Sequence, residues 1–102
     1  MICTTQTEGT KAILTLEGPF TFEAAAEFKA CAHAALEHPG IAELHLDFKG
    51  VSELDPSALG SLLMLREKAE STGAQIILLH PNPGVRSMLE GVKFALLFEI
   101  RA

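Results

Sequence analysis

Alternation of apolar and polar residues predicts three strands in the first half of the chain. In Lys11–Glu17 every second residue is apolar, which is typical of a strand with one buried face. The preceding segment, Ile2–Thr7, is separated from it by Glu8-Gly9, and we predict that the two pair across this turn. After a break at Pro39-Gly40, the alternation returns in Ile41–Phe48, a third strand with one more polar face.

Two longer segments repeat apolar residues at spacings of three and four, the pattern of an amphipathic helix. The first is expected to run from a cap at Thr21 to about Leu36. The second opens with Asp55-Pro56, where the carboxylate can accept a hydrogen bond from a free backbone N–H and proline has none to leave unpaired. Gly73 readily takes the left-handed conformation that ends a helix, so we predict this helix to reach about Thr72.

The last third of the chain continues the alternation of strand and helix. Ala74–Leu79 is an almost unbroken apolar run, as in a strand covered on both faces. Asn82-Pro83 repeats the cap-and-proline pattern and opens a short helix that ends at Gly91, and Leu96–Ile100 is the last predicted strand. The order β-β-α-β-α-β-α-β predicts an α/β fold, a mixed sheet with helices packed on it, in a single domain over residues 1–102.

The second helix is predicted to have a buried face centred on Leu59. At about 100° per residue, the positions on or beside that face are Ala58, Leu62, Leu63, Leu65 and Ala69. The opposite side would then carry Ser57, Gly60, Ser61, Met64 and Lys68. Met64 is a large apolar side chain on an otherwise small and polar face, so either another helix covers it or it belongs to a docking surface beside Ser57.

Composition and charge narrow the classes of function. The chain has 8 lysines and arginines against 13 aspartates and glutamates, a formal net charge of −5, which argues against a nucleic-acid partner. No apolar stretch is long enough to cross a bilayer. The segment Met1–Thr7 lacks the basic start and apolar stretch of a secretion signal. We therefore expect a cytoplasmic protein without membrane insertion.

Residues that could catalyse a reaction or bind a metal are poorly arranged for it. Ser57 lies in no Gly-x-Ser-x-Gly elbow, the histidines lack zinc-binding spacing, and no glycine-rich phosphate loop is present. Cys3 and Cys31 form no Cys-x-x-Cys pair and are expected to be reduced, with Cys31 a small core residue. Asp47 and Asp55 could form a carboxylate pair, but two separate solvated carboxylates are the simpler interpretation. We expect no enzymatic activity, no cofactor and no metal.

Ser57 is the most informative polar residue, because it falls on the first turn of the second helix. The positive end of a helix dipole tolerates added negative charge, so modification of this hydroxyl could change the surface charge without unfolding the domain. The same residues are also compatible with an ordinary helix start.

The run Leu46-Asp47-Phe48-Lys49-Gly50-Val51, followed by Leu54-Asp55-Pro56-Ser57-Ala58-Leu59-Gly60, resembles the STAS domain. More narrowly, it resembles the bacterial anti-sigma factor antagonists. The resemblance implies that Ser57 is phosphorylated by an anti-sigma factor that is itself a protein kinase, and that Asp55 takes part in recognition. Pro56 replaces a hydroxyl residue of the family motif, and Ala58 replaces its glycine.

The resemblance also implies the partners and two functions. The first is a binding protein that sequesters an anti-sigma factor serine kinase with a histidine-kinase-like ATPase fold, and releases it once Ser57 is phosphorylated. A serine phosphatase would reverse the modification. The predicted partner-binding residues are Asp47, Asp55, Pro56, Ser57, Ala58, Gly60, Ser61, Met64 and Lys68. The alternative is a constitutive STAS subunit of a bacterial ABC-type lipid transport complex that is never phosphorylated.

Overall fold

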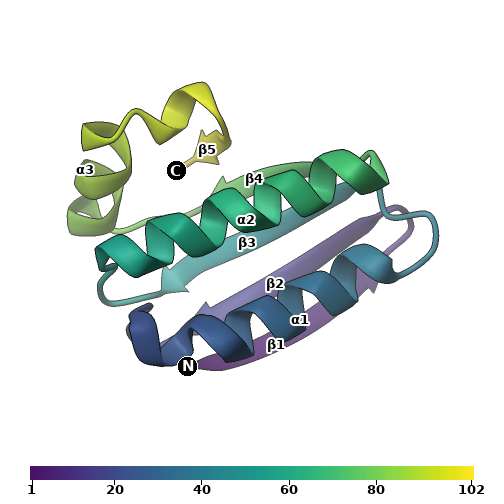
Figure 1. Cartoon of the computed structure of the whole chain (residues 1–102), viewed down its shortest axis with the longest axis horizontal. Helices are drawn as coiled ribbons and strands as arrows, with labels where there is room; N and C mark the ends of the chain where they lie inside the picture. The colour runs from purple at the N-terminus through teal and green to yellow at the C-terminus, as the bar shows by residue number, and fades with distance from the viewer.

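All the predicted strands join one five-stranded sheet, in which neighbours along the chain are neighbours in space. The computed structural model describes residues 1–102 (Figure 1). The first two strands form the predicted antiparallel hairpin, and every later pairing is parallel. The strands are β1 (Ile2–Glu8), β2 (Lys11–Glu17), β3 (Glu43–Gly50), β4 (Gln75–Leu79) and β5 (Glu99–Arg101).

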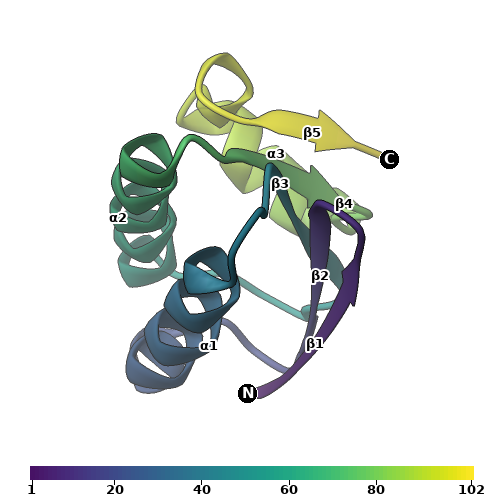
Figure 2. The ribbon, with the colours of Figure 1, turned by 90° about the vertical axis from the view of Figure 1, so that its right-hand side faces the viewer.

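The helices lie on one face of the sheet because each parallel connection steps to the next strand in the same direction. Right-handed crossovers of this kind place every helix on the same side. Figure 2 shows α1 and α2 side by side on that face. The helical segments are η1 (Phe22–Ala24), α1 (Ala25–Glu37), α2 (Pro56–Thr72), α3 (Pro83–Gly91) and η2 (Phe94–Leu96).

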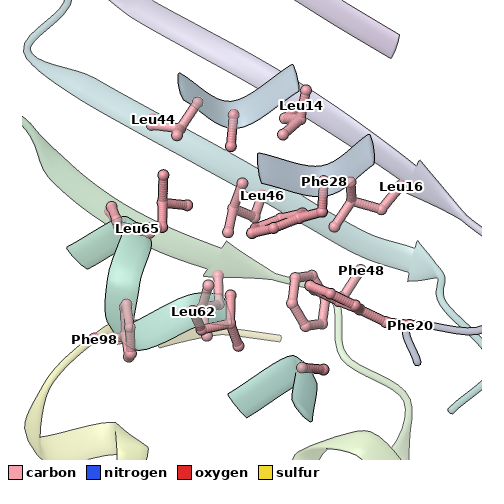
Figure 3. Close-up of a cluster of buried hydrophobic side chains, with 14 of the residues drawn as sticks. Leu14, Leu16, Phe20, Phe28, Leu44, Leu46, Phe48, Leu62, Leu65 and Phe98 are labelled. Atoms are coloured by element: carbon pink, nitrogen blue, oxygen red, sulfur yellow. The ribbon is translucent and has the colours of Figure 1, made fainter. Parts of the chain in front are cut away.

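The core fills the space between the sheet and these helices (Figure 3). Alternate residues of β2 and β3 point into it, as the sequence pattern predicts, and they meet Phe28 of α1 and Leu62 of α2. Phe20 anchors the segment before η1, with its ring 4.6 Å from Phe28 and 6.3 Å from Phe48 between centroids. This anchor holds the loop after β2 against the end of β3.

The caps of α2 and α3 form as predicted. The Asp55 side chain accepts a hydrogen bond from the backbone N–H of Ala58, and Asn82 does the same for Val85. Gly73 ends α2 with a φ of 78°, a left-handed conformation that glycine adopts without strain.

The first helix and the last strand differ from the prediction. Thr21 makes no side-chain cap, and a 3-10 turn precedes α1. The last strand is shorter than predicted because Phe94–Leu96 forms a second 3-10 turn. That turn buries both Phe94 and Phe98 and leaves Leu96 80% exposed, since residues four apart share one face of a turn.

The buried face of α2 is not centred on Leu59, so that prediction is wrong. Leu59 is half-buried and Leu63 is 40% exposed. The buried residues recur at spacings of four, three and four, and they are Ala58, Leu62, Leu65 and Ala69. The face is therefore rotated by about a quarter-turn from the predicted one.

Neighbours on both flanks of α2 explain the rotation. On one flank, Lys68 approaches Glu37 of α1 to 3.6 Å. On the other, Arg66 donates to the backbone oxygen of Leu97, after η2, at 3.2 Å. Ser57, Ser61 and Lys68 consequently lie half-buried on the flank that faces α1, rather than opposite the core.

Candidate functional site

The start of α2 is held by the Asp55 carboxylate. Its Oδ1 accepts hydrogen bonds from the Ser57 hydroxyl at 2.6 Å and from the Ala58 N–H at 3.0 Å. Its Oδ2 accepts from the backbone N–H of Phe22 at 3.0 Å. Asp55 therefore joins the candidate phosphoacceptor to the first turn of α2 and to η1.

These hydrogen bonds keep Asp55 ionised. The bond from the Ser57 hydroxyl is the main cause that holds the pKa of Asp55 below its usual value, and the backbone N–H groups of Ala58 and Phe22 add to it. The site thus presents a carboxylate that already accepts the serine proton in a hydrogen bond.

The loop before Ser57 is fixed from two sides. The Phe20 N–H donates to the oxygen of Glu53 at 2.9 Å, and the Asp55 N–H donates back to the oxygen of Phe20 at 3.3 Å. From the other side, the Asn82 side-chain amide donates to the oxygen of Val51 at 3.1 Å. These hydrogen bonds fix the loop and thereby the position of Ser57 at the start of α2.

Three of the predicted site residues continue from Ser57 along the flank of α2 that faces α1. Ser61, Met64 and Lys68 follow it at helical spacings of four, three and four. Met64 is 54% exposed, so no other helix covers it, and its part in docking stays a prediction. Ser57 is half-buried and lies on the same flank of α2 as Met64.

A groove of about 220 Å³ lies between α1 and α2 on this flank. Its lining residues are Ala25, Ala26, Phe28, Lys29, His33, Ser61, Met64 and Leu65. Burial lowers the pKa of His33, and the positive charges of Lys68 and Lys29 lower it further. Three basic side chains therefore gather beside an apolar groove.

Burial rules out one predicted partner contact, Ala58, and the fold separates another, Asp47, from the Ser57 site. Ala58 is fully buried, so its methyl group packs in the core and cannot touch a partner. Asp47 lies in β3 between Thr15 and Leu79 and points away from the helices, because its neighbours Leu46 and Phe48 face the core.

The carboxylate pair of Asp47 and Asp55 does not form. Asp47 accepts a hydrogen bond from the Lys49 N–H at 2.9 Å, and it shares none with Asp55 or Ser57. The remaining predicted residues, Pro56 and Gly60, are exposed on the outer surface of α2.

Sequence reasoning missed the contribution of the first helical segments. Phe22 is 76% exposed, and its N–H is one of the three donors to Asp55. Lys29 and His33 reach the groove from α1. The only signal for Phe22 was an aromatic residue in a polar turn, and nothing in the local pattern connects α1 with Ser57.

The two cysteines are free and half-buried. The Cys31 sulfur lies 3.7 Å from the Thr5 hydroxyl, so Cys31 sits at the junction of α1 and β1 rather than in the fully buried core. Burial raises the pKa of Cys3 to about 12, and the neighbouring Cys31 thiol adds to the effect. Neither thiol touches the Ser57 site.

Asp55→Ala should destabilise the protein at neutral pH and lose this effect in acid. The lowered pKa of Asp55 means that its stabilisation is fully present above the unfolded-state pKa, near 4, and disappears as the pH falls through the lower folded-state value. Urea unfolding from pH 7 to pH 3 measures it. Asn82→Ala removes an uncharged cap, so its cost of about 1 kcal/mol should not change with Asp55 titration. A pH-independent difference for Asp55→Ala would contradict the interpretation.

Comparison with known proteins identifies the family. The model described as "Mlab, STAS domain" matches residues 3–97. A STAS-domain containing protein of Pseudomonas aeruginosa is 35% identical over 95 residues, which cover 91% of this chain and 90% of that protein. None of the helices is long and apolar enough to cross a membrane.

Solved structures share the fold at low sequence identity. An anti-sigma factor antagonist from Mycobacterium paratuberculosis matches 98% of this chain and 84% of its own, with a TM-score of 0.82 and 16% identity. The Bacillus cell fate determinant SpoIIAA in its phosphorylated form matches 99% and 92%, with a TM-score of 0.73 and 18% identity.

A sulfate transporter family protein from Wolinella succinogenes matches 90% of this chain and 76% of its own, with a TM-score of 0.79 and 18% identity. The fold therefore occurs both in regulators and in transport proteins. The family match over nearly the whole chain, together with the 35% identical relative, shows that this protein belongs to the STAS domain family.

Proposed function

We propose that this protein is an anti-sigma factor antagonist whose binding is switched by phosphorylation of Ser57. The observation that carries the proposal is the 2.6 Å hydrogen bond from the Ser57 hydroxyl to the ionised Asp55 carboxylate, on the first turn of α2. The partner is an anti-sigma factor with serine kinase activity, and a serine phosphatase restores the unmodified form. Both would act in the cytoplasm.

The hydrogen bond supports the chemistry of phosphoryl transfer. As the serine oxygen bonds to the γ-phosphorus of ATP, the bond between that phosphorus and ADP breaks and the hydroxyl loses its proton, which a carboxylate within hydrogen-bond reach can take. In this reading the kinase supplies ATP and metal, while Asp55 orients the acceptor. The tied loop before α2 keeps the hydroxyl in place.

The position of Ser57 also supports a switch that leaves the fold intact. A phosphoserine carries about −1.5 to −2 charges at neutral pH. The positive end of the α2 dipole offsets part of this charge, whereas an acidic group of the partner would be repelled by it. Phosphorylation then releases the partner without unfolding the domain.

Ser57 should be the residue that is phosphorylated. The purified protein is incubated with ATP and candidate anti-sigma kinases from the same genome, and the modified peptide is mapped by mass spectrometry. We expect the phosphate on the peptide that contains Ser57, and no incorporation into Ser57→Ala. Ser52 and Ser61 are the nearest other serines, and phosphate on either of them in the wild type would overturn the assignment.

The alternative is a constitutive subunit of an ABC-type lipid transport complex. Pro56 and Ala58, where the family motif has a hydroxyl residue and glycine, favour this function, and so does the family description. The two functions differ in a simple observation. Protein isolated from cells would carry phosphate on Ser57 in the first case, and would remain unmodified and bound to a transporter ATPase in the second.

A further inference from the structure

The groove between α1 and α2 has an apolar interior and a basic rim. Phe28 and Leu65 form its floor, and no acidic residue is among those that line it. Five of the eight basic side chains lie within 4 Å of a carboxylate, and they are Lys11, Arg66, Lys68, Arg86 and Arg101. Lys29 is exposed at the groove and has no such partner. In a chain of net charge −5, Lys29 is therefore an uncompensated positive charge at the edge of this groove.

The groove continues the surface that carries Ser57. Met64, on the groove, is seven residues from Ser57, or about 10 Å along the helix axis at 1.5 Å per residue. Both residues lie on the flank of α2 that faces α1. A segment of a partner that covers Ser57 can therefore also reach the groove.

We propose that this groove binds an acidic segment of the protein partner, with one bulky apolar side chain in the groove and a carboxylate against Lys29. The proposal rests on the function proposed above and adds the chemistry of the partner. A cavity of this volume takes one leucine or phenylalanine side chain. The unpaired Lys29 favours a carboxylate of the partner beside it, whereas Lys68 is already paired with Glu37.

This choice of partner also accounts for release. A phosphate on Ser57 would face the same acidic segment at a distance of about two turns of α2. Phosphorylation would thus weaken the groove contact without any change in the shape of the domain.

Paired charge variants test the proposal without an identified partner. Random 16-residue peptides displayed on phage are selected against the intact wild-type protein. We expect enrichment of peptides that combine aspartate or glutamate with leucine or phenylalanine, and that shift the amide resonances of residues 25–33 and 61–65. Binding should fall about tenfold or more in Lys29→Glu and Met64→Glu. It should fall less in Met64→Lys, which removes the same apolar contact but adds a positive charge.

Lys93→Glu is the matched control, because Lys93 is also exposed and unpaired but lies between α3 and η2. Lys29 and Met64 lie within α1 and α2, where glutamate and lysine are good helix formers, and Lys93→Glu exchanges one exposed polar side chain for another, so these variants should keep the wild-type melting temperature and amide spectrum. Selected peptides that are neutral or basic, or that bind Lys29→Glu as well as the wild type, would overturn the proposal. So would the recovery of no binding peptide.

A second copy of this chain is the competing occupant. Sedimentation velocity of the wild type and of Met64→Glu distinguishes it: a wild-type dimer that the variant abolishes would replace the proposed partner segment by self-association. A monomer in both cases supports the proposal.

The kinase that modifies Ser57 separates this proposal from the proposed function. If that kinase phosphorylates Ser57 and binds Lys29→Glu with wild-type affinity, the proposed groove contact is wrong and the phosphorylation switch is retained. If no kinase modifies Ser57 but binding of the acidic peptides still requires Lys29, the phosphorylation switch is wrong and the proposed groove contact is retained.

Discussion

Phosphorylation of Ser57 should weaken binding of the anti-sigma factor about a hundredfold. One unit of the added charge, opposed by a single carboxylate of the partner at roughly 6 Å, costs about 3 kcal/mol at an effective dielectric constant of 20. Every 1.4 kcal/mol is a factor of ten in affinity. The position of Ser57 beside Asp55 adds to the effect, because the modified side chain can no longer donate its proton to that carboxylate. Isothermal titration of the phosphorylated and unmodified proteins with the kinase measures the change.

Ser57→Asp should reproduce part of this loss, since it adds one charge on a shorter side chain. Ser57→Ala should bind the kinase persistently in the presence of ATP, because nothing remains to be modified. Ser87→Asp is the control for added charge, as Ser87 is exposed on α3, away from the groove. Equal affinities of the phosphorylated and unmodified proteins would refute the switch. They would be expected of a constitutive subunit.

Local signals explain why most of the fold could be predicted. The caps at Asp55 and Asn82 and the left-handed Gly73 act through bonds that span three or four residues, so the sequence itself contains both partners. The alternation in β2 and β3 likewise depends only on which face of each strand is covered by the helices. These features allowed the helix boundaries and the order of helices and strands along the chain to be predicted.

The errors come from contacts between segments that are distant in the sequence. Thr21 makes no side-chain cap, and the N–H of Phe22 next to it donates to Asp55, which lies 33 residues further along the chain. The buried face of α2 depends on which flanks are covered, and α1 on one flank and the segment after η2 on the other decide that. No periodicity within α2 contains this information.

The site was predictable to the same extent. The cap between Asp55 and the Ala58 N–H is local and forms as predicted, whereas the hydrogen bond from the Ser57 hydroxyl to the same carboxylate was not predicted. The position of Asp47 could have been inferred from the alternation in β3, since Leu46 and Phe48 point into the core and Asp47 must point away. The groove was beyond reach, because Lys29 and His33 enter it only through the packing of α1 on α2.

Leu62→Ala should lower the free energy of unfolding by about 2–5 kcal/mol, the usual loss when a buried leucine is truncated and a cavity remains. Leu62 is fully buried in the centre of the core beneath α2 (Figure 3). Met64→Ala, two positions away on the same helix, should change it by no more than about 0.5 kcal/mol, because the Met64 side chain is half-exposed. Urea unfolding followed by circular dichroism gives both values.

The comparison separates packing from recognition on one helix. Met64→Ala should keep its stability and bind the partner more weakly, since it removes an apolar contact at the rim of the groove. Leu63→Ala is the matched exposed control, because Leu63 lies on the other flank of α2 and is 40% exposed. A loss of several kcal/mol in Met64→Ala would mean that another segment covers this flank. Unchanged stability with unchanged binding would move the docking surface away from α1 and toward the tied loop before Asp55 or the start of α3 at Asn82.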